Sequence, residues 1–218
     1  MTAEPAPVNR WVDPEWAKRY LSRRDQIPHR VEGMQVLMEV LPPDPRRVLD
    51  LGTGDGYTLG LLRGAHPGIE GVGVDFSAEM LGRARVRFAG DADVEIVEHD
   101  LDEPLPSSLG RFDVVVSSFA IHHCVHARKR ALYREVFDLL QPGGAFANLD
   151  HVDSATPELH LEFLAAIGHT PENDDPSNKL LDVETQLSWL RDIGFTNVDC
   201  HWKWRELALL CGVKPARV

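Results

Sequence analysis

The spacing of hydrophobic positions along the chain changes from a helical to a strand pattern and back several times. Residues 13–41 carry apolar side chains three and four residues apart, with a break near Pro28, which predicts two helices. From residue 46 onward, short apolar runs are bounded by glycine or proline, as is typical of buried parallel strands. The expected strands are 46–51, 71–75, 94–98, 112–117 and 145–149, and the expected helices between them are 58–63, 77–88 and 129–140.

The alternation of strands and helices favours an α/β protein with a doubly wound, mostly parallel sheet covered on both faces. Beyond a Pro-Gly-Gly turn at 142–144 and the fifth strand, the pattern changes. We expect an inserted helix at 156–167, a polar loop at 170–178, a helix at 183–192, and an antiparallel hairpin of strands 197–204 and 207–213 at one edge of a seven-stranded sheet. We also expect residues 1–41 to form a tail and a helical cap, and residues 42–218 to form the core, with an inserted segment near 155–180.

The net charge of the chain indicates which class of partner it binds, whereas its overall composition does not. The 218 residues are 43% hydrophobic and 26% charged, as in ordinary globular proteins. The formal charge is -11, and a surface of that sign repels a phosphate backbone. The one local basic run, residues 128–130, is short. These features favour a small-molecule partner and count against a nucleic acid.

The cysteines and the chain's start bear on its compartment. Cys124, Cys200 and Cys211 form no CxxC pair, which indicates a reducing compartment and predicts a cytoplasmic protein. Residues 1–9 lack the apolar segment of a signal peptide, and no run of about 18 apolar residues occurs. We therefore expect no membrane partner, and a monomer or homodimer.

The sequence VLDLGTGDG at 48–56 runs from the first strand into three alternating glycines. Such glycines permit a tight turn and let a ligand approach the backbone at the carboxyl end of the strand. Nicotinamide enzymes use G-x-G-x-x-G, whereas Tyr57 stands here where the last glycine would be. The spacing disfavours a nicotinamide oxidoreductase, which stays open as an alternative.

Polar residues also follow the next two strands. Asp75 ends the second strand, where a carboxylate can accept hydrogen bonds from ribose hydroxyls; the alternative is a helix N-cap, which Ser77 can supply instead. After the third strand, Asp100 could accept from an adenine amino group, while Leu101 or Met80 sandwiches the ring. The ends of three successive strands thus predict one nucleoside-binding crevice.

The segments VLDLGTGDGY, GVGVDFSAEML, EHDLDEPLP, FDVVVSSFAIHH and LLQPGGAFANLD, within residues 46–150, resemble the successive motifs of class I S-adenosylmethionine-dependent methyltransferases. The resemblance implies a Rossmann-like fold, S-adenosylmethionine as cofactor, and methyl transfer to O, N or S of a small molecule. It implies ten cofactor-binding residues: Asp50, Gly52, Thr53, Gly54, Asp75, Phe76, Met80, Asp100, Leu101 and Ser117. In this family the glycine turn holds the methionine part, Asp50 supports its ammonium group, Phe76 and Met80 flank the adenine, and Ser117 lies near the methionyl tail.

Three histidines near the ends of the fourth and fifth strands, His122, His123 and His151, are candidates for a general base. Each could instead pack beneath a loop and bond a backbone carbonyl. A further alternative is that His122 or His123 binds a divalent metal together with Asp150 and His151, although their spacing matches no recognised ligand set.

The N-terminal helices could form a lid over the cofactor. Arg30 or the Arg23-Arg24 pair could then clamp an acceptor carboxylate, or these arginines could lie on a solvated helix face. Trp11 and Trp16 could anchor the lid or simply pack. Besides small-molecule methylation, an RNA methyltransferase and a non-catalytic protein that binds S-adenosylmethionine remain alternatives.

Overall fold

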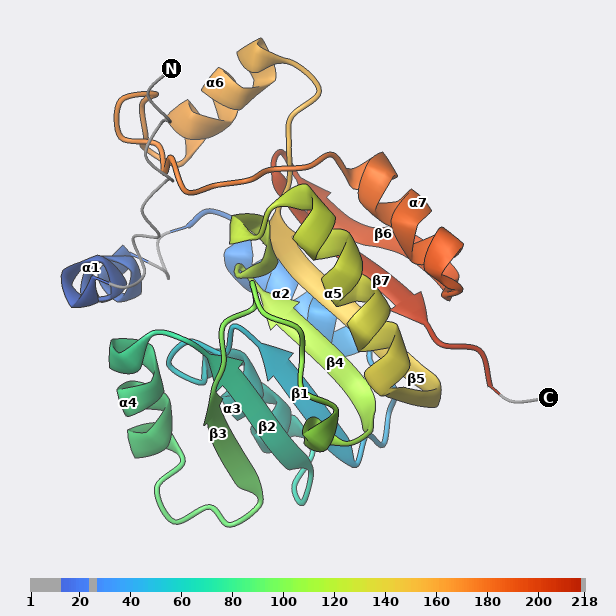
Figure 1. Ribbon diagram of the computed structural model, residues 1–218. Helices are drawn as coiled ribbons and strands as arrows, with labels where there is room; N and C mark the ends of the chain where they lie inside the picture. Colours follow the sequence, from blue (N-terminus) through green and yellow to red (C-terminus); the bar gives the residue numbers. More distant parts are fainter. Residues whose placement is uncertain (1–12, 24–26, 217–218) are drawn as a thin grey trace, which may run out of the picture.

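A seven-stranded sheet forms the centre of the computed structural model, which describes residues 13–23 and 27–216 (Figure 1). Its strand order is β3-β2-β1-β4-β5-β7-β6. Strands β1 to β5 pair in parallel, and β7 is antiparallel to both β5 and β6. The strands are β1 Arg47–Leu51, β2 Glu70–Asp75, β3 Val94–Glu98, β4 Phe112–Ser118, β5 Leu140–His151, β6 Thr196–Trp204 and β7 Leu207–Val213. The predicted Rossmann-like sheet with its antiparallel edge hairpin is confirmed.

Helices cover both faces of the sheet, as expected for parallel strands buried on two sides. α5 and α7 pack on one face with the core cluster around Phe146, whereas α2 and α3 pack on the other with the cluster around Leu149. The helices are α1 Pro14–Arg23, α2 Arg30–Val40, α3 Tyr57–Ala65, α4 Ala78–Arg87, α5 His126–Leu139, α6 Pro157–Ala166 and α7 Val183–Ile193, with short 3-10 helices η3 Ser107–Leu109 and η4 Ile121–His123.

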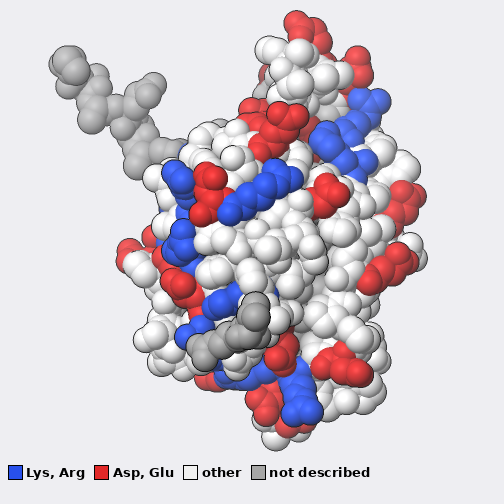
Figure 2. All heavy atoms as spheres, turned by 90° about the vertical axis from the view of Figure 1, so that its right-hand side faces the viewer, with Lys and Arg blue, Asp and Glu red and all other residues white. Residues whose placement is uncertain are grey.

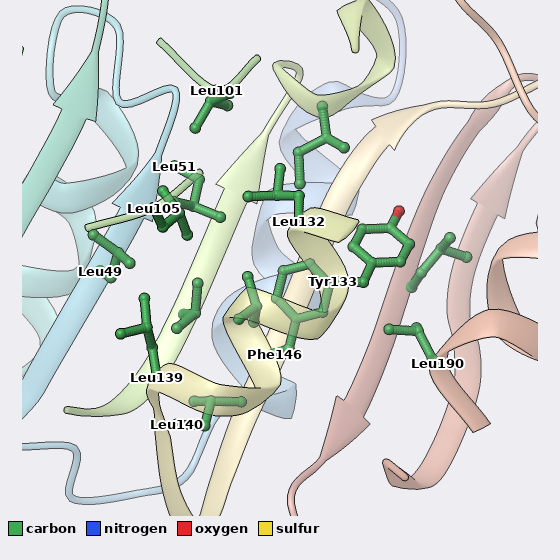
Figure 3. Close-up of a cluster of buried hydrophobic side chains, with 14 of the residues drawn as sticks. Leu49, Leu51, Leu101, Leu105, Leu132, Tyr133, Leu139, Leu140, Phe146 and Leu190 are labelled. Carbon is green, nitrogen blue, oxygen red and sulfur yellow. The ribbon is translucent and has the colours of Figure 1, made fainter. Parts of the chain in front are cut away.

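The larger core cluster lies between α5, α7 and one face of the sheet. Figure 3 shows side chains of α5, such as Leu132 and Tyr133, lying against Phe146 of β5, with Leu190 of α7 beside them. All four are fully buried. Each such apolar side chain contributes roughly 1.5–3 kcal/mol on burial, so the cluster fixes α5 and α7 on this face.

The turn between β1 and α3 requires glycine at its first position. Gly52 has φ +67°, in the left-handed region, and a Cβ there would lie 2.1 Å from Cβ of Ala120. A side chain would therefore collide with the segment that follows β4, besides straining the backbone. The absence of a side chain brings the turn after β1 against the turn after β4.

The start of β5 differs from expectation. β5 begins at Leu140, five residues before the expected strand, and the Pro-Gly-Gly segment lies inside it. Leu140 pairs with Phe112 and Ala145 with Val114, so the residues between form a bulge. Gly143 N–H donates to the Lys214 carbonyl at 2.8 Å, which ties the bulge to the chain after β7. The expected turn before β5 was therefore wrong, because long-range pairing takes up these backbone groups.

A buried carboxylate attaches the segment between β5 and α7 to the sheet. Glu206, in the β6–β7 turn, has no exposed surface. Its Oε2 pairs with His151 Nε2 at 2.8 Å, and its Oε1 pairs with His160 Nδ1 of α6 at 2.9 Å and accepts a hydrogen bond from Ser154 Oγ. We call Glu206 and these three residues the Glu206 cluster. It fixes α6, which Figure 1 shows beyond the carboxyl ends of the strands.

Charged side chains of both signs are interspersed on the side of the molecule seen in Figure 2. No helix within residues 13–23 and 27–216 combines the length and the apolar character that a bilayer crossing requires.

Candidate functional site

A cavity opens at the carboxyl ends of β1 to β4, in the place where open α/β sheets bind ligands. Its volume, counted with the open mouth, is about 880 Å³. The turns after the four strands supply most of the wall, and α1 and α2 contribute Leu21 and Arg30. The lining includes Gly52, Thr53, Gly54, Asp75, Phe76, Met80, Asp100 and Leu101, which are eight of the ten expected cofactor residues.

Asp75 holds two neighbouring segments together at the cavity wall. Its Oδ2 accepts a hydrogen bond from Gly54 N–H at 2.9 Å, and its Oδ1 accepts one from Ser77 N–H at 2.8 Å. Burial raises the pKa of this carboxyl group above its usual value. Ser77 occupies the N-cap position of α4 without a side-chain capping bond. Because a carboxylate has about four acceptor positions, Asp75 keeps capacity for further donors such as ribose hydroxyls.

Asp50 lies behind the glycine turn instead of in the cavity wall. It is buried, and its Oδ2 accepts a hydrogen bond from Thr53 Oγ1 at 2.7 Å. Within the described part of the chain, its Oδ1 has no hydrogen-bond partner. Burial raises the pKa of Asp50 to about 7. A buried carboxylate at this position suits the stabilisation of a cationic ligand group at the turn. Thr53 would lie between the carboxylate and that group.

The glycine turn leaves room for a ligand. A Cβ built on Gly54 would have Met80 Sδ, at 3.9 Å, as its one close neighbour among the described residues. Both residues line the cavity. The turn and α4 therefore form a cradle that suits the polar tail and the flat ring of an adenosine derivative.

Ser117 and Ser118 divide the end of β4 between the core and the cavity. Ser117 is fully buried, does not line the cavity, and donates its hydroxyl to the Leu51 carbonyl at 2.9 Å. Ser118 lines the cavity, and its buried hydroxyl has no partner in the part of the chain that the structure describes. The cavity is also lined by His99, Asp102, Ser118 and Cys124, none of which was predicted as a site residue. The alternation of side chains along a strand could have indicated Ser118 once the core face was known.

The three candidate histidines lie together, but only one of them lines the cavity. The His122 ring centroid is 4.0 Å from that of His123 and 5.7 Å from that of His151. His122 Nδ1 lies 2.5 Å from Asp150 Oδ1, and His151 is engaged by Glu206. His123, on η4, lines the cavity. Of the three, His123 is placed to meet a substrate.

Burial and the neighbouring His122 hold the pKa of His123 well below its usual value. Its imidazole is therefore neutral at physiological pH, with a lone pair on one of its two ring nitrogens. The hydroxyl of Ser177 lies 3.1 Å from His123 Nδ1, although 54 residues separate the two along the chain. This contact gives the ring a defined orientation.

The structure bears differently on the alternative metal site and on the residues predicted for the lid. Within the described residues, no three His, Cys, Asp or Glu side chains are grouped so that they could hold a metal ion, so the proposed metal set finds no support. Arg30 is buried, lines the cavity, and has its guanidinium carbon 4.4 Å from the ring centroid of Phe119. The expectations for Trp11, the Arg23 side chain and Arg24 fall outside what the structure describes.

Comparison with known proteins defines the family. A family model described as a methyltransferase domain matches residues 48–144. A demethylmenaquinone methyltransferase from Clavibacter sepedonicus is 32% identical over 194 residues, which cover 81% of this chain and 77% of the relative. A malonyl-[acyl-carrier protein] O-methyltransferase from Methylococcus capsulatus is 31% identical over 158 residues, which cover 72% of this chain and 54% of the relative.

Among solved structures, human N-acetylserotonin methyltransferase in complex with S-adenosylmethionine matches with a TM-score of 0.70 at 16% identity. The match covers 99% of this chain and 61% of the human chain. The chain thus spans less than two thirds of the length of the human protein and of the Methylococcus relative. The identity and coverage of the Clavibacter relative, on a sheet of the order described above, show that the chain belongs to the class I S-adenosylmethionine-dependent methyltransferases, enzymes whose cofactor is S-adenosylmethionine.

Proposed function

We propose that the enzyme transfers the methyl group of S-adenosylmethionine to O, N or S of a small-molecule acceptor within the cavity. The observation that carries the proposal is the convergence of the turns after β1, β2 and β3 on one cavity, into which the N-terminal helices place Leu21 and Arg30. These helices act as a cap over the core, and a cap of this kind excludes water from the reaction. The two relatives are a demethylmenaquinone methyltransferase and a malonyl-[acyl-carrier protein] O-methyltransferase, which supports an acceptor other than nucleic acid.

The cofactor residues follow from the cavity wall. Gly52, Thr53 and Gly54 hold the methionine part, and Asp50 supports its ammonium group through Thr53. Asp75 holds the ribose. Five further residues were expected at the cofactor. Phe76, Met80, Asp100 and Leu101, which line the cavity, contact the adenine in this proposal, whereas Ser117 supports the turn from behind.

Charge in the cavity supports the same assignment. Among the described lining residues, Asp55, Asp75, Asp100 and Asp102 are acidic, and Arg30 is the one Lys or Arg. This excess of carboxylates suits a cationic sulfonium and disfavours a polyphosphate chain.

The chemistry requires little covalent participation by the protein. S-adenosylmethionine supplies an electrophilic methyl group, so the protein mainly aligns the acceptor and keeps water out. An acceptor that carries a proton on its nucleophilic atom needs a base, and His123 is the candidate that lines the cavity. His122 and His151 help to hold His123 in place. The His122 ring packs against the His123 ring, and the His151 ring packs against the His122 ring.

The state of the cysteines bears on the cellular compartment. Cys124, Cys200 and Cys211 are all free thiols, which fits a cytoplasmic enzyme. We propose that it acts as a monomer or homodimer.

Calorimetry with S-adenosylmethionine and S-adenosylhomocysteine tests cofactor binding, and formation of S-adenosylhomocysteine with a panel of hydroxyl, amine and thiol acceptors tests turnover. We expect binding of both nucleosides and turnover with a small acceptor. Turnover only with tRNA would support an RNA methyltransferase, and tight binding without any product would support a non-catalytic role. Stabilisation by NADH in place of S-adenosylmethionine would contradict the cofactor assignment.

A further inference from the structure

The loop after α6 is fixed against the histidines at the end of β4. We call residues 175–179 the Ser177 loop. Lys179 N–H donates to the His122 carbonyl at 2.8 Å. Lys129 of α5 is almost fully buried, and its ammonium donates to the His122 carbonyl at 3.3 Å and also to the Lys179 carbonyl. A buried ammonium bound to both segments holds the Ser177 loop at a defined position on η4.

Asp175 fixes the Ser177 side chain within this loop. Its Oδ1 accepts two hydrogen bonds from Ser177, one from the backbone N–H at 2.9 Å and one from the hydroxyl at 2.8 Å. Ser177 itself is largely buried, and its Oγ lies 3.1 Å from His123 Nδ1. The three side chains therefore form a chain of hydrogen bonds that ends at a cavity residue.

The direction of these hydrogen bonds follows from the number of protons available. A carboxylate only accepts, so the single hydroxyl proton of Ser177 is donated to Asp175. The Ser177 oxygen can then only accept from His123, which requires a proton on Nδ1. In neutral imidazole the lone pair then lies on Nε2.

We propose that Asp175 and Ser177 are positioning residues for methyl transfer: they fix the Nδ1–H tautomer of His123 and so make Nε2 the nitrogen that accepts the proton of the acceptor. The inference rests on the proposed role of His123 as the base. As the heteroatom of the acceptor bonds to the methyl carbon, the carbon–sulfur bond breaks and its electron pair stays on sulfur. The acceptor's proton moves to Nε2, and the imidazolium later returns that proton to solvent. Donation from Nδ1–H toward Ser177 and Asp175 stabilises the imidazolium while it exists.

The tautomer can be measured directly by NMR on protein labelled with 15N at histidine, at pH 8, where His123 is neutral. Loss of one signal set in His123→Gln assigns the resonance. We expect wild-type His123 to carry its proton on Nδ1, and Ser177→Ala to move the population toward the Nε2–H form that histidine prefers in water. Ser177→Thr keeps the hydroxyl and should retain the wild-type tautomer, which a merely space-filling role for Ser177 would not explain.

An Nε2–H tautomer in the wild type, or an unchanged tautomer in Ser177→Ala, overturns the proposal. Asp175→Ala provides a second variant if Ser177→Ala does not fold, because it frees the serine proton to turn toward Nδ1 and should produce the same shift. The measurement needs no acceptor. If the tautomers behave as expected but no acceptor is methylated, the proposed function fails and the proton arrangement stands.

Discussion

The backbone N–H of Gly54 donates to the carboxylate of Asp75 at 2.9 Å, which joins the turn after β1 to the end of β2. The same carboxylate also accepts from Ser77 N–H at the start of α4. Asp75 therefore shapes the cavity and also lines it, so its substitution should affect both stability and cofactor affinity.

Replacement of Asp75 separates these two effects. Asp75→Ala should weaken the binding of S-adenosylmethionine by about 1–3 kcal/mol, since it removes charge-assisted hydrogen bonds to the ribose. Calorimetry measures the affinity, and a melting curve reports the stability. Asp75→Asn keeps one acceptor oxygen and should give intermediate values for both. A folded Asp75→Ala protein with wild-type affinity would place the ribose elsewhere.

Asp50 should make the stability of the cofactor-free protein depend on pH. Burial raises its pKa from 3.8 to about 7, so the folded state binds a proton more tightly than the unfolded chain does. Its contribution is therefore favourable at low pH and is lost as the pH rises from about 4 to about 7. Asp50→Asn should lack this dependence and raise the melting temperature at pH 8, relative to wild type, more than at pH 5. Equal shifts at both pH values would contradict the raised pKa.

Alanine substitutions at Gly52 and Gly68 distinguish the cost of a steric collision from the cost of backbone strain. Gly52→Ala combines a positive φ with a Cβ contact of 2.1 Å to Ala120, so it should lower the free energy of unfolding by more than about 3 kcal/mol or prevent folding. Gly68 has φ +92° and no heavy atom within 4 Å of a built Cβ among the described residues, so Gly68→Ala should cost about 1 kcal/mol. Urea denaturation measures both. Similar losses would show that the collision with Ala120 is relieved at little cost.

Loss of the Glu206 side chain should strongly destabilise the protein, although this residue lies in a turn. Glu206→Ala leaves His151, His160 and Ser154 without their acceptor and should cost about 3–5 kcal/mol. Glu162→Ala is the matched control, because it removes an exposed ion pair with Arg205 and should cost less than about 1 kcal/mol.

The cost of Glu206→Ala should also vary with pH. Burial opposes ionisation of Glu206, but hydrogen bonds from His151, Ser154 and His160 outweigh it and hold its pKa below the usual value. Its stabilising contribution is therefore present above the unfolded pKa and is lost as the pH falls through the folded pKa. Denaturation at pH 7 and pH 4 should show the gap between wild type and variant narrowing in acid.

The two adjacent histidines should have different kinetic effects. His123→Gln should lower kcat about 100-fold or more with a hydroxyl or thiol acceptor, because it removes the base. His122→Gln should mainly lower the melting temperature, since it removes the buried contact with Asp150. Because burial holds the pKa of His123 well below its usual value, the wild-type rate should fall only on the acid side of neutrality. Equal kinetic losses in the two variants would contradict the assignment.

Much of the fold could be predicted because the information is local. The glycine turn at Gly52 and the acidic residue at the end of β2 are set by a few adjacent residues, and parallel strand order brings their ends together. Eight of the ten expected cofactor residues line the cavity for this reason. The start of β5 could not be predicted, since its bulge depends on pairing with Lys214, far along the chain.

The acceptor side of the site was harder to predict, because its contacts join distant segments. Ser177 lay in a loop expected only to be polar, and nothing local indicates that Lys129 holds this loop against His122. The choice between Ser117 and Ser118 depends on which side chain of a strand faces the core, and a shift of one residue reverses it.

The position of Glu206 near the end of the sequence also has a consequence for biosynthesis. The chain leaves the ribosome from its N-terminus, so the four strands whose ends form the cofactor cavity emerge well before the carboxylate that holds α6 in place. A nascent chain halted shortly before residue 206 would contain the four strands whose ends form the cavity but would lack the carboxylate that holds α6. The residues that line the cavity are therefore synthesised before the residue that holds α6 in place.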